Sequence, residues 1–228
     1  MAEIGLYEAM RSLRAVRRLR PDAVPDEVLH RVIEAARWAP TGGNAQPWRV
    51  IAVRERATKE ALGALYAERW RVYAVHHRKL IADRPEAVVH KTARMLDAGD
   101  HLADHFADTP VVLVFCFNPK AMAITDADLG RISIVGGASV YTAVENLLLA
   151  CRAEGLGCVL TTLLCECEPR VRELLGIPEP WGTAAAIPIG WPLRRGHGPI
   201  SRRPVEKLAF AERWGQPLPG HVGPGARG

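Results

Sequence analysis

The chain alternates between apolar residues spaced three or four positions apart and short continuous apolar runs. The first kind of spacing predicts a helix over residues 26–38, whose first turn carries two acidic residues, as the helix dipole favours. The same spacing predicts a long, mostly apolar helix over 135–152 and a short helix over 170–175 that ends at Gly176.

The segment from Thr58 to about Phe106 has the weakest pattern in the chain. It is expected to be helical and to break at Pro85, because proline cannot continue a helix. We expect substrate-facing helices or a lid here. Trp70 and Tyr73, with two histidines after them, either line a substrate mouth or pack as ordinary surface residues.

Four continuous apolar runs predict buried strands. The run over 110–117 is rich in β-branched residues and is expected to be central, and the others lie at 50–53, 158–163 and 184–189. Because strands and helices alternate, we expect a layered α/β or α+β domain.

The segment after Arg203 differs from the rest of the chain. Residues 204–210 are compatible with an extended strand, and Trp214 then precedes a proline- and glycine-rich end. An apolar extension with little core of its own usually packs on another body. We expect a single domain over 1–218 and a disordered tail over 219–228.

Composition narrows the class of protein. The 228 residues are 48% hydrophobic and 24% charged, which are ordinary values for a globular protein with one core. The net charge of +5 comes from scattered arginines with few aromatic residues among them, which favours solvated surface and a local phosphate site over nucleic-acid binding. Without a bilayer-length apolar stretch or the features of a secretory signal, the expected location is the cytoplasm.

Metal and disulfide chemistry are not indicated. Five cysteines at irregular spacing favour reduced, mostly buried thiols over a disulfide framework. Cys165 and Cys167 lack a second pair at ligand spacing. His101 and His105 lie one helical turn apart among three aspartates, and a solvated helix face is favoured there over a zinc or iron site. Neither a Rossmann glycine motif nor a phosphate loop occurs.

The segment over 39–48 has a composition too specific for a generic turn. Two prolines flank a Gly-Gly pair, which leaves Thr41 and Asn44 as short hydrogen-bonding side chains on a constrained loop. Such a loop suits a planar polar ligand. Local chemistry alone slightly favours the simpler interpretation, a helix end that leads into a strand.

Four segments carry a resemblance to a known family. Residues 40–48 read Pro-Thr-Gly-Gly-Asn-Ala-Gln-Pro-Trp, and residues 14–25 begin Arg-Ala-Val-Arg and end Val-Pro. Residues 146–157 contain an apolar helix and a Gly-Leu-Gly turn, and residues 173–192 end Pro-Ile-Gly-Trp-Pro. Taken in chain order, from about residue 11 to 205, they resemble the nitroreductase family of FMN-dependent oxidoreductases.

The resemblance implies a three-layer α+β fold, α/β/α, with a mostly antiparallel central sheet and helices on both faces. It also implies a homodimer with two flavins in its interface and a C-terminal arm exchanged between the subunits. The implied reaction is hydride transfer from NADH or NADPH to FMN, followed by reduction of a nitroaromatic, a quinone or a related acceptor in the same pocket. No nucleophilic side chain is required, since the cofactor performs the redox chemistry.

The resemblance also assigns residues, one by one. The FMN phosphate is expected to meet Arg14, Ala15 and Arg17, where Ala15 replaces a usual serine and offers only its backbone. Arg14 and Arg17, three residues apart, are expected to share one side of a helical turn. Arg202 and Arg203 are the expected second phosphate cluster, with Arg203 preferred because it directly precedes Pro204.

The remaining cofactor residues lie in the middle of the chain. Pro40, Thr41, Gly42 and Asn44 are expected to reach a flavin bound mainly by the other subunit, and Ser139, Thr161 and Thr162 complete the set. The two threonines stand where many relatives carry Pro-x-Glu-Gly at the isoalloxazine edge. A hydrolase-like triad built from Ser139, Tyr141 and His197 is not expected, because no nucleophile motif accompanies it.

Two alternatives remain open. One is a different reaction on the same fold, namely flavin fragmentation, dehalogenation or ring oxidation. The other is a protein that binds or stores FMN without turnover.

Overall fold

The structure is a computed structural model that describes residues 4–219. The chain divides into two compact units, Met1–Gly198 and Pro199–Gly228. Most of the predicted disordered tail, 219–228, lies outside the described residues. The boundary predicted for a single domain at residue 218 stays a prediction.

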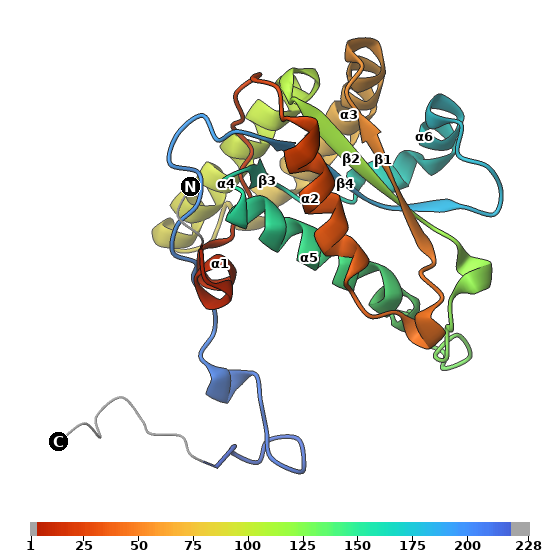
Figure 1. Cartoon of the computed structure of the whole chain (residues 1–228). Coiled ribbons are helices and arrows are strands. Elements are labelled where there is room, and N and C mark those ends of the chain that lie inside the picture. Colours follow the sequence, from red (N-terminus) through yellow and green to blue (C-terminus); the bar gives the residue numbers. More distant parts are fainter. Residues whose placement is uncertain (1–3, 220–228) are drawn as a thin grey trace. The chain divides into compact units, whose positions relative to one another are not determined.

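The first unit contains a four-stranded antiparallel sheet in the order β1-β2-β4-β3 (Figure 1). The register aligns Trp48 with Phe117 in the first pair and Gly157 with Gly190 in the last. The mostly antiparallel sheet implied by the resemblance is therefore confirmed. The strands are β1 (Trp48–Val53), β2 (Val111–Phe117), β3 (Gly157–Cys158) and β4 (Gly182–Gly190).

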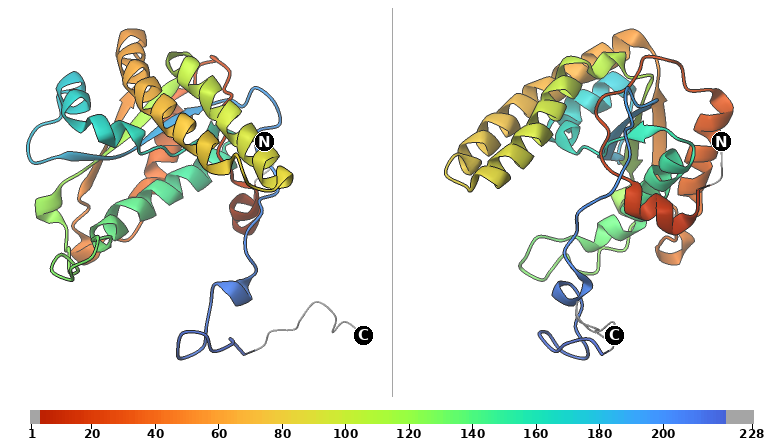
Figure 2. Two further views of the ribbon diagram at one scale, coloured as in Figure 1. Left: turned by 180° about the vertical axis from the view of Figure 1, so that it is seen from behind. Right: turned by 90° about the vertical axis from the view of Figure 1, so that its left-hand side faces the viewer.

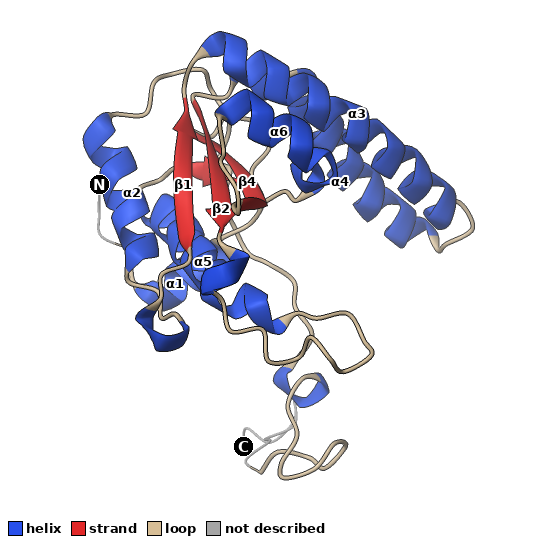
Figure 3. Cartoon of the chain, turned by 90° about the vertical axis from the view of Figure 1, so that its right-hand side faces the viewer, coloured by secondary structure: helices blue, strands red, loops and turns tan. Residues whose placement is uncertain are grey.

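Helices cover both faces of this sheet, as Figure 3 shows most directly. Alternate residues of β2 separate the two cores: Leu113 and Phe115 pack in one, and Val112 and Val114 pack in the other. The first core lies under α2 (Asp26–Arg37) and α5 (Ala138–Ala153). The second lies under α3 (Arg56–Ile81), α4 (Glu86–Asp104) and α6 (Glu168–Leu175). The left view of Figure 2 shows the molecule from the side on which these helices lie. The predicted three-layer arrangement is confirmed.

Most predicted helices have the expected bounds. Pro85 precedes the first residue of α4 and separates it from α3, while α6 ends at Gly176 in a left-handed conformation with φ of 63°. The short α1 (Leu6–Ser12) has no counterpart among the predicted elements. Among the described residues, no helix is both long enough and apolar enough to cross a membrane.

Two strand predictions are wrong. Of 158–163, only Cys158 belongs to a strand. Thr161 still pairs with Ala186 of β4, but only as an isolated bridge. After Thr162 the backbone turns, and the Cys165 N–H donates to the Thr162 carbonyl at 2.9 Å. In the second unit, the segment 204–210 is not extended. Its N–H groups bond locally instead, with Lys207 N donating to the Pro204 carbonyl at 3.0 Å.

The thiols and the aromatic residues of α3 are mostly core. All five cysteines are free, and four of them are buried, as predicted. Trp70 is only 4% exposed and donates from Nε1 to Asp100 Oδ1 at 2.8 Å, so it packs inside rather than lining a substrate mouth. Tyr73 stacks on His77 with ring centroids 3.8 Å apart.

Candidate functional site

The opening segment is extended, so the predicted helical turn over Arg14 and Arg17 is wrong. α1 ends at Ser12, and Leu13 already has extended backbone angles. The N–H of Val16 donates to the Cys158 carbonyl at 2.8 Å, and its side chain is only 5% exposed. The segment therefore lies against β3, and its two arginines reach different neighbours.

Arg14 is anchored but keeps its terminal nitrogens free. Its Nε donates to the Gly196 carbonyl at 2.5 Å, and the side chain is exposed. Within residues 4–219, its two terminal nitrogens make no hydrogen bond or ion pair. The adjacent Ala15 is also exposed. One fork of guanidinium donors is thus available to an anion.

Arg17 is half-buried and carries an uncompensated charge. No hydrogen bond or carboxylate partner engages it in the described part of the chain. Burial lowers the pKa of its guanidinium, although the nearby Tyr66 and Tyr73 act in the opposite direction. Desolvating a cation without a partner is costly, so this arrangement favours a bound anion.

Tyr66 connects Arg17 to Thr161. The Tyr66 ring is 1% exposed, and its hydroxyl shares a hydrogen bond with the Thr161 side chain. Burial raises the pKa of Tyr66 to about 12, so the hydroxyl stays protonated. Thr161 is itself held to β4 by paired backbone bonds with Ala186, at 2.9 and 2.8 Å. Tyr66 was not predicted from the sequence, and the only signal was aromatic spacing along α3.

The loop over 40–48 is held on the start of α5. The Gly42 N–H donates to Ser139 Oγ at 3.0 Å, and Thr41 Oγ1 accepts from the Gln46 N–H at 3.0 Å. Asn44 has a φ of 54°, a left-handed conformation that asparagine tolerates better than most residues. The structure therefore brings Ser139 together with the predicted loop. The Pro40 carbonyl accepts from the Thr142 hydroxyl at 3.3 Å on the same helix.

A hollow of about 250 Å³ lies between the start of α5 and the start of β4. Thr162 lines it, and the Tyr141 hydroxyl donates to the Ala184 carbonyl at 3.2 Å beside it. None of the described residues that line this hollow carries a charged side chain, which suits a flat, uncharged ring. The lining residues are Phe117, Met122, Val140, Tyr141, Thr162, Cys165, Thr183 and Ala184.

The arginine end and the loop end of the site lie at opposite ends of α5. Ser139 is in its first turn, whereas Arg152, in its last turn, donates to Ser12 Oγ at 2.8 Å. Thirteen residues of helix correspond to about 20 Å. The candidate site is therefore long, with cationic groups at one end and hydroxyl and amide groups at the other.

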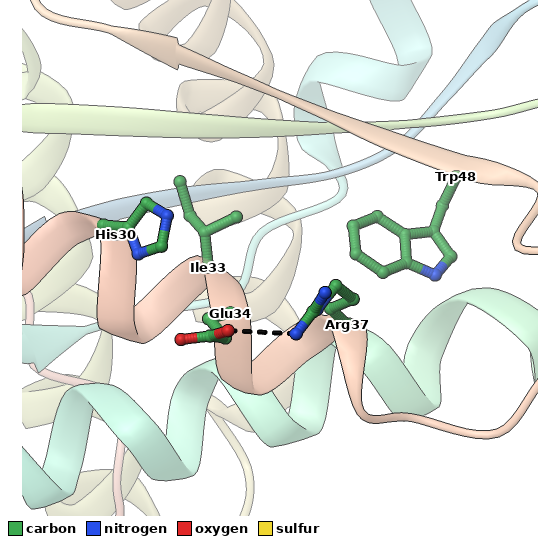
Figure 4. A pocket seen from close by; sticks show the side chains of 5 residues that line it. All are labelled: His30, Ile33, Glu34, Arg37 and Trp48. Atoms are coloured by element: carbon green, nitrogen blue, oxygen red, sulfur yellow. Dashed lines mark hydrogen bonds and ion pairs between the residues drawn. The ribbon is translucent and has the colours of Figure 1, made fainter.

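A second hollow, of about 290 Å³, lies between α2 and the start of β1 (Figure 4). Its lining includes Trp48 and the ion pair between Glu34 and Arg37 at 3.0 Å. Because these charges neutralise each other and no predicted site residue lines it, we do not assign the ligand to this hollow.

The remaining residues singled out in the sequence lie outside this site or stay untested. Arg202 and Arg203 are exposed residues of the second unit, and their phosphate role stays a prediction. His105 Nδ1 faces Asp108 Oδ2 at 3.0 Å and its ring lies 4.3 Å from that of His101. Among residues 4–219, no group of three metal-ligating side chains converges.

The loop before α5 is organised by one buried carboxylate. Asp126, 3% exposed, accepts from Ser133 Oγ at 2.6 Å, from Arg131 Nη1 at 2.6 Å and from the Ile134 N–H at 3.1 Å. The hydrogen bond from Ser133 contributes most to lowering the pKa of Asp126, to about 2. Met122, from this loop, lines the 250 Å³ hollow.

Replacing Asp126 with alanine is expected to loosen this loop. Because the folded pKa is depressed, the stabilisation by Asp126 is present above about pH 4 and is lost as the pH falls towards 2. At pH 7 the Ile134 amide of Asp126→Ala should exchange its hydrogen at least about tenfold faster than in wild type. The exposed Asp128→Ala is the control, and equal exchange in wild type and Asp126→Ala would contradict the assignment.

Comparisons with known proteins show the family of this chain. The model of the nitroreductase family matches residues 10–191. The chain is 32% identical over 202 residues to a protein of Thermus thermophilus named NADH dehydrogenase, covering 86% of this chain and 91% of that protein. It is 30% identical over 218 residues to the 5,6-dimethylbenzimidazole synthase of Rhodospirillum rubrum, covering 94% and 92%.

A solved structure shows the same fold. The nitroreductase from Desulfovibrio desulfuricans in complex with FMN superposes with a TM-score of 0.63 at 23% identity, covering 93% of this chain and 99% of that one. The family model spans most of the first unit, including the opening arginines and the loop over 40–48. The chain belongs to the nitroreductase family.

Proposed function

We propose that this chain is an FMN-dependent oxidoreductase that takes electrons from NADH or NADPH and passes them to a second small molecule. The observation that carries the proposal is Arg17, a half-buried guanidinium without a carboxylate partner among the described residues. Arg14, three residues before it, keeps its terminal nitrogens free. A phosphate that is linked to a flat ring matches both the cationic end and the uncharged hollow.

Different residues would bind different parts of the cofactor. Arg14, Arg17 and the backbone of Ala15 would bind the phosphate. The resemblance predicts Arg202 and Arg203 as further phosphate ligands. Thr161 and Thr162 would contact the edge of the ring. The loop residues Pro40, Thr41, Gly42 and Asn44, held by Ser139, would contact the flavin of a partner subunit in a cytoplasmic homodimer.

When bound, FMN would supply a ring that accepts a hydride from the nicotinamide and returns electrons to the second substrate. The protein's own part is to bind, to orient and to exclude water. The buried, protonated Tyr66 fixes the Thr161 hydroxyl, and β4 fixes its backbone. The Gly42–Ser139 hydrogen bond fixes the loop, so both walls of the site are preorganised.

One further reaction has specific support. The similarity to 5,6-dimethylbenzimidazole synthase extends over 94% of this chain. The name of that protein describes the synthesis of a new compound, not the transfer of electrons to an acceptor. Flavin fragmentation is therefore the second candidate. Incubating the reduced protein with oxygen and analysing the flavin by mass spectrometry would distinguish loss of FMN from its reoxidation.

The purified protein should be yellow, and it should release FMN on denaturation. Under anaerobic conditions, adding NADH or NADPH should bleach the absorbance of the bound flavin, and adding a quinone or a nitroaromatic should restore it. A colourless protein that does not bind added FMN would refute the proposal. Bound FMN with no turnover beyond one equivalent of NAD(P)H per site would favour the storage alternative.

A further inference from the structure

Two side chains near Arg14, those of Arg152 and His197, have no role in the site as described so far. Arg152, in the last turn of α5, is half-buried, and its only side-chain hydrogen bond to the residues that the structure describes is the one to Ser12 Oγ at 2.8 Å. No carboxylate pairs with it in the part of the chain that the structure describes. Arg152 is therefore a second guanidinium with free donors near the start of the chain.

His197 forms a cluster with Arg14 and Arg152. It is 7% exposed, and its Nε2 lies 2.7 Å from the Leu156 carbonyl, so that nitrogen carries a proton and donates. Its other ring nitrogen, Nδ1, is buried and has no partner within residues 4–219. A buried polar atom without a partner is uncommon in a folded protein and often marks a site for a missing group.

The chain around His197 ties the cluster to the phosphate segment. The carbonyl of Gly196 accepts from Arg14 Nε at 2.5 Å, and the Gly198 N–H donates to the Ser12 carbonyl at 3.1 Å. Ser12 in turn accepts from Arg152. Thus the residues on either side of His197 hold the two elements that carry Arg14 and Arg152.

We propose that Arg152 and His197 complete the phosphate site begun by Arg14, and that His197 takes up a proton when a phosphate dianion binds. The inference rests on the proposed function, because it assigns further residues to the same cofactor end. It adds a proton to the binding step, which the assignment of Arg14 and Arg17 alone does not require.

The charged groups that face His197 are Arg14, from the segment after α1, and Arg152, from α5. Desolvation lowers the pKa of His197 below its ordinary value, and the two cations add to this. The hydrogen bond to the Leu156 carbonyl acts in the opposite direction but is outweighed, so the imidazole is neutral at pH 7. A dianion between the arginines would offset their field and raise that pKa. Between the two pKa values, the affinity for phosphate should fall about tenfold per unit rise in pH.

Calorimetry measures how many protons the protein takes up when FMN binds. FMN is titrated into the flavin-free wild type at pH 7 in two buffers of different ionisation enthalpy, and the same titration is repeated with His197→Gln. Glutamine keeps a donor for the Leu156 carbonyl. Wild type should take up roughly half a proton more than the variant. Equal proton uptake in the two proteins would overturn the role of His197.

Ligand comparison tests the role of Arg152. Arg152→Gln should weaken FMN binding about tenfold to a hundredfold and leave riboflavin, which lacks the phosphate, unchanged. Arg11→Gln is the matched control, because Arg11 is exposed and already paired with Glu8. FMN affinity of Arg152→Gln equal to that of wild type would overturn its assignment.

Inorganic phosphate separates this inference from the proposed function. The pKa of His197 is followed by NMR in wild type as phosphate is added, with the exposed His90 as internal control. An upward shift of His197 alone supports the site, even if FMN fails to bind and the proposed function is wrong. FMN binding without any shift of His197 would sustain the proposed function and overturn this inference.

Discussion

Replacing both Arg14 and Arg17 with glutamine is expected to weaken FMN binding by about two to four orders of magnitude. Each guanidinium would lose a charge-assisted hydrogen bond to phosphate, worth about 1.5–3 kcal/mol, and a 1.4 kcal/mol loss corresponds to a factor of ten. Arg17 should contribute the larger share, because it is half-buried and has no other partner among the described residues. Quenching of flavin fluorescence gives the dissociation constants.

Riboflavin is the internal control for this double variant. Its affinity should change by less than about twofold, since the arginines would touch only the phosphate. Arg11→Gln, on the exposed face of α1, should bind FMN like wild type. An equal loss of riboflavin and FMN affinity would show that the double replacement disturbs the fold rather than a phosphate site.

Replacing Gly99 with valine is expected to destabilise the protein by about 3 kcal/mol or more. A Cβ at Gly99 would lie 1.9 Å from Trp70 Cζ2, inside the contact between α3 and α4. Trp70 cannot move aside easily, because it is 4% exposed and its indole Nε1 is bonded to Asp100. The melting temperature should fall by roughly 6–12 °C, as measured by circular dichroism.

Arg94→Val is the matched control for Gly99→Val. It introduces the same β-branched side chain into α4 at an exposed position. Its melting temperature should stay within about 2 °C of that of wild type. Equal losses in the two variants would mean that helix propensity, not the close approach of α4 to Trp70, decides the stability.

The layers and most elements were predictable from the sequence because their patterns are local. The spacing of apolar residues in α2 and the continuous apolar run of β2 reflect burial on one face and on both faces, respectively. Pro85 and Gly176 marked helix boundaries through backbone constraints that each residue carries by itself. The apolar run after Cys158 was misleading, because its pairing with β4 is reduced to an isolated bridge at Thr161 and the backbone then turns after Thr162.

The candidate site was only partly predictable. The loop over 40–48 and the opening arginines were found by resemblance, and Ser139 does meet that loop. Sequence spacing could not show that Arg14 and Arg17 lie on an extended segment, since Val16 is held there by Cys158, far away in the chain. Nor could it find Tyr66, Arg152 or His197, whose relevance comes from burial and from missing partners rather than from any motif.

Titration of the flavin-free wild type with FMN and with riboflavin is the most direct test of cofactor binding at the arginine end. We predict one FMN per chain, with an affinity at least about a hundredfold higher than that for riboflavin, because the phosphate would meet two uncompensated guanidinium groups. Equal affinities for the two flavins, or no binding of either, would contradict the assignment of Arg14 and Arg17 to an FMN phosphate.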